Sequence, residues 1–137
     1  MKNIVIDTSV AIKWFFSEPG SKKAIELKDK HIRGELSLYS RDLLLYEFTS
    51  AFRNYSSQKI EEKDFSLAVS AVMSLKMKLL PLEHREAPEL FLISKKLAIS
   101  VYDGSFLLLA NRLKVPFYTA DKKLYLKGKT WQEMVLI

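Results

Sequence analysis

The sequence predicts an α/β fold, with a central parallel sheet of four or five strands and helices on both faces. Short apolar runs rich in β-branched residues alternate with longer stretches in which apolar residues recur at helical spacing. Strands that alternate with helices in this way form a parallel sheet covered on both faces. Right-handed crossovers then bring the strand ends, with the loops that follow them, to one edge of the sheet.

The first half of the chain is expected to hold two strands and four helices. Residues 4–6 form an apolar run typical of a strand buried on both faces, and Thr8 and Ser9 favour a helix start directly after it. The letters SEPG at 17–20 break that helix, and Gly34 ends the next one. The expected strands are 4–6 and 36–39, and the expected helices are 9–16, 21–33, 43–57 and 61–75.

The second half is expected to hold three strands and three helices. Pro88 is compatible with this pattern because proline is tolerated in the first turn of a helix. The expected strands are 79–82, 115–119 and 133–137, and the expected helices are 87–100, 102–113 and 121–127. No repeat, low-complexity tract or linker interrupts the 137 residues, so we expect one domain spanning 1–137.

Composition narrows the class of protein. The chain has no Cys, which excludes disulfides and Cys-based zinc sites. It has no signal-peptide pattern and no apolar run of about 18 residues, so we expect a cytoplasmic protein. The net charge is +6, with 22 basic residues. Such a balance is compatible with a solvated Lys-rich surface or with a phosphate-bearing partner.

Three acidic residues follow predicted strands or open predicted helices: Asp7, Asp103 and Asp121. The carboxyl edge of an open α/β sheet is where ligands bind, which suggests a site. The alternative for each is a helix cap. Glu47 differs because it lies inside a predicted helix, at the edge of the buried face, with no basic residue three or four positions away. A half-buried carboxylate needs a partner, although Glu47 could also lean into solvent.

At these positions the chain resembles a known family. The segment IDTSVAIKWF at 6–15 is similar to the opening of PIN-domain ribonucleases, especially the VapC-type toxins. Glu47 lies in LYEFTSA at 45–51, Asp103 in YDGSFLLLA at 102–110, and Asp121 in YTADKKL at 118–124, in the family's order. The resemblance covers essentially the whole chain. It implies a Mg²⁺- or Mn²⁺-dependent endoribonuclease, usually paired with a protein antitoxin.

Two positions depart from the family pattern. Gly104 stands where the family more often has Ala, and a glycine at a helix start should be tolerated there. Lys122 and Lys123 follow Asp121, where some members have a further carboxylate, so the resemblance leaves open whether one or two metal ions bind.

The chemistry of the four acids is consistent with this implication. Clustered carboxylates raise one another's pKa, and oxygen-only ligands suit hard cations such as Mg²⁺ or Mn²⁺. We expect Asp7 and Asp103 to be the main ligands, with Glu47 and Asp121 binding through water or orienting the nucleophile. Ser9 or Thr8 would fix a carboxylate or a metal-bound water, unless these hydroxyls only cap a helix.

Other residues suggest partners. Five basic residues that flank the acidic motifs are candidate RNA contacts, although each is also compatible with a solvated charge: Lys13, Arg41, Arg53, Lys122 and Lys123. The aromatic run 14–16 is suited to base stacking, core packing or a subunit contact. The broad apolar face of 65–75 suggests a homodimer or a surface for another partner. His31 and His84 are expected on the surface.

Other functions remain open at this stage. A PIN-domain nuclease that processes RNA without an antitoxin fits the same residues. An RNA-binding module with an inactive site fits the basic surface but does not require all four acids. A receiver or phosphatase-like domain also gathers acids at strand ends, but this chain has no acidic pair at the end of its first strand.

Overall fold

A parallel sheet of five strands forms the centre of the computed structural model, which describes residues 2–55 and 59–137. The strands lie in the order β3-β2-β1-β4-β5, and every neighbouring pair is parallel. Their bounds are β1 (Lys2–Ile6), β2 (Leu36–Arg41), β3 (Lys78–Leu80), β4 (Phe117–Thr119) and β5 (Met134–Leu136). The predicted α/β class, with its parallel sheet, is confirmed.

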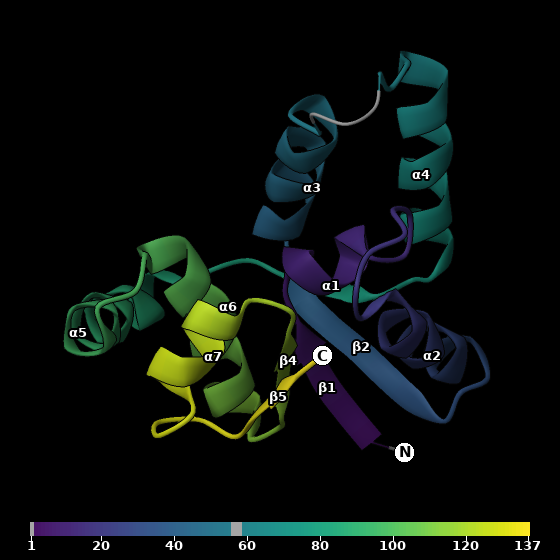
Figure 1. Ribbon diagram of the computed structural model, residues 1–137. Helices are drawn as coiled ribbons and strands as arrows, with labels where there is room; N and C mark the ends of the chain where they lie inside the picture. The colour runs from purple at the N-terminus through teal and green to yellow at the C-terminus, as the bar shows by residue number, and fades with distance from the viewer. Residues whose placement is uncertain (1, 56–58) are drawn as a thin grey trace.

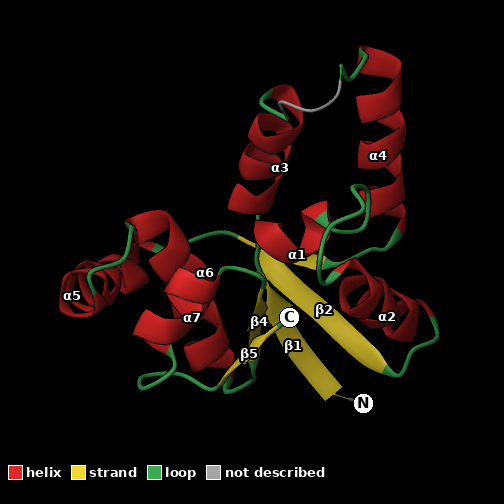
Figure 2. Ribbon diagram, viewed as in Figure 1, coloured by secondary structure: helices red, strands yellow, loops and turns green. Residues whose placement is uncertain are grey.

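Helices cover both faces of the sheet (Figure 1). Their bounds are α1 (Thr8–Ile12), α2 (Ser21–Ile32), α3 (Leu43–Arg53), α4 (Glu62–Ser74), α5 (Ala87–Leu97), α6 (Val101–Leu113) and α7 (Lys122–Gly128), with a 3₁₀ turn at His84–Glu86. Figure 2 shows α2 on one side of the strands and α5, α6 and α7 on the other, while α3 and α4 extend beyond the sheet.

The central strand explains this layering. Side chains alternate between the faces of a strand. Ile4 and Ile6 of β1 pack with Ala24 of α2, whereas Val5 packs with Phe106 of α6 on the opposite face. All five of these residues are fully buried. Because β1 is buried on both faces at the centre of the sheet, its carboxyl end, where Asp7 follows, is held in a fixed position between β2 and β4.

Some helices end earlier than predicted. The first was expected to reach residue 16 but ends at Ile12, and the amides of residues 13–15 bond to carbonyls only three residues back. The fifth was expected to reach residue 100 but ends at Leu97, because Ala98 adopts a left-handed conformation with φ of 56°. The third ends at Arg53 rather than 57, and residues 56–58 lie outside the described residues.

His31 was expected on the surface, and the structure corrects this. Its Nδ1 accepts a hydrogen bond from the Leu38 amide at 3.1 Å, and its Nε2 lies 2.5 Å from the Leu75 carbonyl. The ring is therefore a neutral tautomer with the proton on Nε2. His31 connects α2, β2 and the end of α4, so its role is structural.

Candidate active site

Asp7 follows directly after β1 and is 5% exposed. Its Oδ1 accepts hydrogen bonds from the Ser9 amide at 3.1 Å and from the Ser9 hydroxyl, so Asp7 caps α1. Its Oδ2 accepts a bond of 2.7 Å from the Thr119 hydroxyl at the end of β4. Thr119 lies beside Asp7 because β1 and β4 are neighbours in the sheet. Helix capping therefore accounts for the hydrogen bonds to Oδ1 of Asp7 but not for the bond to Oδ2.

Ser9 and Thr119 are themselves held in place. The Ser9 hydroxyl accepts a hydrogen bond from the Ala120 amide at 2.9 Å, and the Thr119 hydroxyl accepts one from the Asp121 amide at 3.1 Å. The two hydroxyl oxygens are 3.3 Å apart. Loops after two neighbouring strands thus share one network around Asp7, and this network fixes the direction of its carboxylate.

The pKa of Asp7 is raised from 3.8 to about 6. Burial is the main cause, because it disfavours the charged form. The hydrogen bonds from Ser9 and Thr119 oppose this shift, and the negative charges of Asp103 and Asp121 add to it. A buried acid that titrates near neutrality beside other acids is typical of a functional site.

Glu47, on α3, contacts the start of α1. The Thr8 hydroxyl donates a 2.7 Å hydrogen bond to its Oε1. Burial raises the pKa of this half-buried carboxyl, the Thr8 bond lowers it, and the charge of Asp103 raises it. The partner that sequence analysis required for Glu47 is thus a hydroxyl from the first motif.

Asp103 does not cap α6, which excludes the capping alternative for this residue. The cap is Ser100, whose hydroxyl accepts a 3.0 Å bond from the Asp103 amide. The Asp103 carboxyl therefore lies in the first turn of α6 without capping it. Its pKa is raised, mainly by burial and secondly by the charge of Asp121. Asp121 does cap its helix: its Oδ1 accepts a 3.0 Å bond from the Leu124 amide.

The four acids are brought to one edge of the sheet. Asp103 is the member that connects them electrostatically, because it influences the pKa of both Asp7 and Glu47 and is itself influenced by Asp121. Asp103 and Asp121 also line a cavity of about 180 Å³, together with Lys123 and Lys127. The acids come from four separate segments, after β1, in α3, in α6 and after β4.

The arrangement is open rather than a tight cage. Within residues 2–55 and 59–137, no group of three His, Cys, Asp or Glu side chains is close enough to hold one ion together. The donor chemistry nevertheless fits a hard divalent cation, because carboxylate oxygens are the ligands such ions prefer. Mg²⁺ keeps several of its waters, so one or two carboxylates suffice for direct contact.

Two of the five basic candidates for RNA contact are engaged elsewhere. Arg41 is 1% exposed, and its guanidinium pairs with Glu86 at 2.8 Å, so its assignment as an RNA contact is wrong. Lys13 bonds to the Pro19 carbonyl at 2.7 Å and pairs with Glu18 at 3.3 Å, which holds its ammonium on its own loop. The other three are exposed: Arg53, Lys122 and Lys123.

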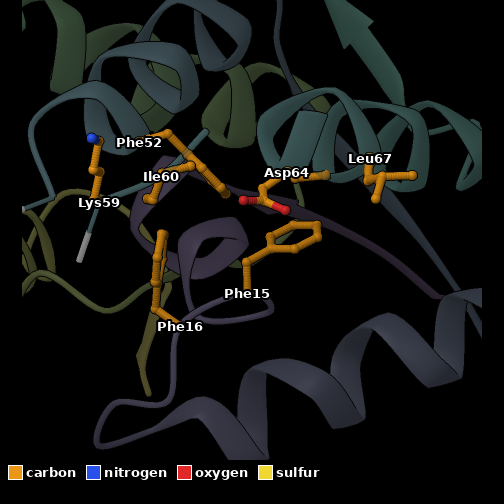
Figure 3. Close-up of a pocket in the computed structure, with 8 residues that line it drawn as sticks. Phe15, Phe16, Phe52, Lys59, Ile60, Asp64 and Leu67 are labelled. Atoms are coloured by element: carbon orange, nitrogen blue, oxygen red, sulfur yellow. The ribbon is translucent and has the colours of Figure 1, made fainter. Parts of the chain in front are cut away.

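The aromatic run at 14–16 packs inside the protein. Phe16 stacks on Tyr55 with ring centroids 3.8 Å apart, and Trp14 donates to the Ala24 carbonyl. Phe15 and Phe16 also line a cavity of about 340 Å³ between α1, α3 and α4 (Figure 3). The cavity has largely apolar walls, with two charged side chains among its lining residues, Lys59 and Asp64. The run thus contributes to core packing, as one of the expected alternatives, and also to the wall of this cavity.

Sequence analysis missed Thr119 as a site residue. Its position was the available signal. Thr119 ends a predicted strand and precedes Asp121 by two residues, just as Asp7 follows a predicted strand and precedes Ser9 by two residues. Ser100 was also missed as the cap of its helix. The available signal was a serine three residues before an acid, which is a helix-start pattern.

Comparison with protein families decides the classification. The family model described as "PIN domain" matches residues 4–129, which include all four acids. The chain belongs to the PIN domain family. No curated protein matches the sequence. Each helix of this PIN domain that the structure describes is too short or too polar to cross a membrane.

Solved structures share the fold of this PIN domain at low sequence identity. PAE2754 from Pyrobaculum aerophilum is 19% identical, with a TM-score of 0.62 over 93% of this chain and 87% of that one. FitAB bound to an IR36 DNA fragment is 14% identical, with a TM-score of 0.71 over 97% and 94%. FitAcB from Neisseria gonorrhoeae is 15% identical, with a TM-score of 0.69 over 96% and 95%.

Proposed function

We propose that this PIN domain is a divalent-metal-dependent endoribonuclease that acts in the cytoplasm as the toxin of a toxin–antitoxin pair. The observation that carries the proposal is Asp7, a buried carboxyl whose pKa is raised to about 6 beside two further acids. Retaining such a group without a ligand destabilises the fold, since burial of a charge is costly. A divalent cation would offset that cost and would favour the ionised form of each carboxyl.

In this proposal Asp7 and Asp103 hold Mg²⁺ or Mn²⁺ directly. When bound, the ion would supply charge neutralisation at the scissile phosphate and acidify water near it. Ser9 and Thr119 orient the Asp7 carboxylate, and Thr8 orients Glu47 through the 2.7 Å bond. Glu47 and Asp121 lie at the flanks of the site, where a carboxylate can accept a proton from the attacking water.

The exposed lysines support a phosphodiester substrate. Lys122 and Lys123 follow Asp121 directly, and Lys123 lines the cavity that Asp103 and Asp121 share. Cations at the border of an acidic site attract the flanking phosphates of a nucleic acid strand while the acids hold the metal. Arg53 lies on the exposed side of α3, the helix that carries Glu47, and would extend this contact.

The apolar cavity beside α1 supports a protein antitoxin as partner. Phe16, Phe52 and Ala68 form buried walls, while Leu67 at its border is 70% exposed. We propose that an apolar side chain of the antitoxin enters here, with a polar neighbour near Lys59 or Asp64 (Figure 3). Expression of the protein should arrest growth, and coexpression of a small protein encoded beside its gene should restore growth. Normal growth during expression would favour an RNA-processing nuclease.

A homodimer is also part of the proposal. Sequence analysis expected it from the broad apolar face of 65–75, and α4 does leave both Met73 and Leu67 exposed, at 69% and 70%. Sedimentation of the protein should give the mass of two chains, and Met73→Lys should give the mass of one. A parent protein that sediments as a single chain would contradict the dimer.

Cleavage of RNA in the presence and absence of metal tests the nuclease directly. The protein, treated with chelator and dialysed, should leave a single-stranded RNA intact and should cleave it internally after Mg²⁺ or Mn²⁺ is added. A DNA strand of the same sequence serves as competitor, because the neighbour FitAB was solved with DNA. Binding of RNA without cleavage under any metal condition would favour the inactive RNA-binding module.

A further inference from the structure

We propose that Arg41 is a positioning residue that holds the Asp103 turn of α6 against the end of β2. The inference rests on the proposed nuclease function. Arg41 is a fully charged side chain that is 1% exposed, in a chain whose other cations lie mostly on the surface. A buried guanidinium has to be hydrogen-bonded on several sides, so the partners of Arg41 reveal which segments it connects.

Each part of the guanidinium contacts a different segment. The Nε–H donates to the Ser105 carbonyl of α6 at 2.8 Å, two residues after Asp103. Nη1 donates to the Pro81 carbonyl at 3.0 Å, and Nη2 pairs with Glu86 at 2.8 Å. Glu86 is itself buried, so Arg41 connects β2 to the segment before α5 and, through the Ser105 carbonyl, to α6 just after its first turn.

The neighbouring residue makes a matching connection to the first acid. The hydroxyl of Ser40, also fully buried, donates a 2.6 Å bond to the Ile6 carbonyl, immediately before Asp7. The end of β2 therefore contacts both the strand that presents Asp7 and the helix that presents Asp103. It also leads through Asp42 into α3, which presents Glu47. The segments that carry Asp7, Asp103 and Glu47 are therefore all attached to, or continuous with, residues 40–41.

The helix turn at Asp103 needs such an attachment. Ser105 donates its hydroxyl to the Tyr102 carbonyl at 2.7 Å, and its own carbonyl accepts from Arg41 at 2.8 Å. Val101 and Tyr102 in the same turn are exposed. The turn therefore has apolar packing on one side only, and the Arg41 bond determines how far Asp103 lies from Asp7 and Glu47.

A paired substitution separates positioning from stability. Breaking a buried ion pair by removing one partner typically destabilises a protein strongly, whereas replacing both partners with apolar residues of similar size is often neutral. Arg41→Met combined with Glu86→Leu lacks the ion pair and the bond to Ser105, and it also loses the bonds of Glu86 to the Glu83 amide and to Arg112. It should therefore fold, with a melting temperature above that of Arg41→Met alone, which leaves Glu86 buried without its main partner. Leu27→Ala, on the buried face of α2, serves as a destabilised control with the Arg41 network intact.

The expected result is weaker metal binding and slower turnover in the paired variant. Calorimetry should give an Mn²⁺ affinity reduced by about tenfold or more, the usual effect of losing a residue that orients a metal ligand. The kcat should fall in proportion, with the KM for RNA unchanged. Leu27→Ala, measured below its melting temperature, should keep the parent's Mn²⁺ affinity and kcat. Parent values of both quantities in the paired variant would overturn the inference and leave the nuclease assignment intact.

Hydrogen exchange gives a result that does not depend on nuclease activity. The amides of 101–105 should exchange faster in the paired variant than in the parent, while those of β1 stay protected. If the parent neither binds Mn²⁺ nor cleaves RNA, the proposed function fails. Faster exchange at 101–105 would then still support the attachment of this turn by Arg41, and unchanged exchange would overturn it.

Discussion

The hydroxyl of Thr119 donates a 2.7 Å hydrogen bond to Oδ2 of Asp7, across 112 positions of sequence. The bond is short in space because β4 lies beside β1 in the sheet, so the residues after both strands meet at one edge. It also has an electrostatic consequence. The bond stabilises the ionised carboxylate against the burial that raises its pKa, and so it lowers the pH above which Asp7 is ionised.

Replacement of Asp7 by Asn should keep the fold and nearly abolish cleavage. Asn caps a helix about as well as Asp, so α1 should form normally. Because burial raises the pKa of Asp7 from 3.8 to about 6, ionised Asp7 destabilises the metal-free protein. This penalty is absent below pH 4, grows between pH 4 and 6, and is complete above pH 6, where it reaches at most about 3 kcal/mol.

The melting temperatures of the metal-free parent and of metal-free Asp7→Asn, each measured at pH 7 and pH 4, test whether ionised Asp7 destabilises the protein. Asp7→Asn should melt at or above the parent temperature at pH 7 and lose that advantage at pH 4. Its affinity for Mn²⁺ and its cleavage rate should both fall. Asp29→Asn on α2, away from the acids, is the matched control and should leave metal binding and cleavage unchanged. Cleavage by Asp7→Asn at the parent rate would remove Asp7 from the mechanism.

Metal binding by the parent should itself depend on pH. A carboxyl must be ionised to bind a cation, and the pKa of Asp7 is about 6. Mn²⁺ affinity should therefore be level above about pH 7 and fall by up to about tenfold per pH unit below pH 6. Calorimetry between pH 5 and 8 would measure this. An affinity that stays level down to pH 5 would show that Asp7 is not the titrating ligand.

The sheet and the position of the acids were predictable because they follow from local pattern. Asp7 comes directly after a β-branched run, and Asp121 comes two residues after the end of an expected strand, so strand ends alone suggested where both would lie. The hydroxyl network was not predictable in the same way. Which hydroxyl bonds to which carboxylate depends on strand order, and the order β2-β1-β4 became known only from the structure.

The contacts of Arg41 and Gly104 could not be predicted from the sequence. Arg41 beside an acidic motif suggested a phosphate contact, and only the fold revealed the buried Glu86, 45 positions later, that pairs with it. At Gly104, a Cβ would lie 3.0 Å from Cδ1 of Leu90 on α5. Gly104, which departs from the family pattern, thus lies where α5 and α6 approach closely. This contact could not be predicted from the sequence of either helix alone.

Removal of the Thr119 hydroxyl should move the pH dependence of metal binding. In Thr119→Val the carboxylate of Asp7 loses a hydrogen bond that lowers its pKa, so the pKa should rise above its present value of about 6. The pH at which Mn²⁺ affinity begins to fall should rise with it. Thr8→Val is the control, because it removes the bond to Glu47 and leaves all three bonds to Asp7. Equal shifts in the two variants would contradict a specific role for Thr119.

Substitution of the lysines after Asp121 should weaken RNA binding in a salt-dependent way. Lys122 and Lys123 border the acids and are exposed, so Lys122→Ala with Lys123→Ala should remove phosphate contacts and leave the fold intact. For every ammonium–phosphate pair that the substitutions remove, the slope of log affinity against log salt should fall by about 0.7 for a single strand. Binding is measured by fluorescence anisotropy without metal, from about 0.05 to 0.2 M salt.

The matched control is a second pair of adjacent exposed lysines, Lys22 and Lys23, at the start of α2. Replacing both with Ala removes the same charge from a helix that packs beside β2, away from the acids. Long-range attraction between a basic protein and RNA would make the two double variants equivalent. Contact at the site instead predicts a reduced salt slope only for the pair after Asp121, because only those ammonium groups replace counterions on the bound strand. Equal slopes in the two double variants would contradict RNA contact at the acidic edge of the sheet.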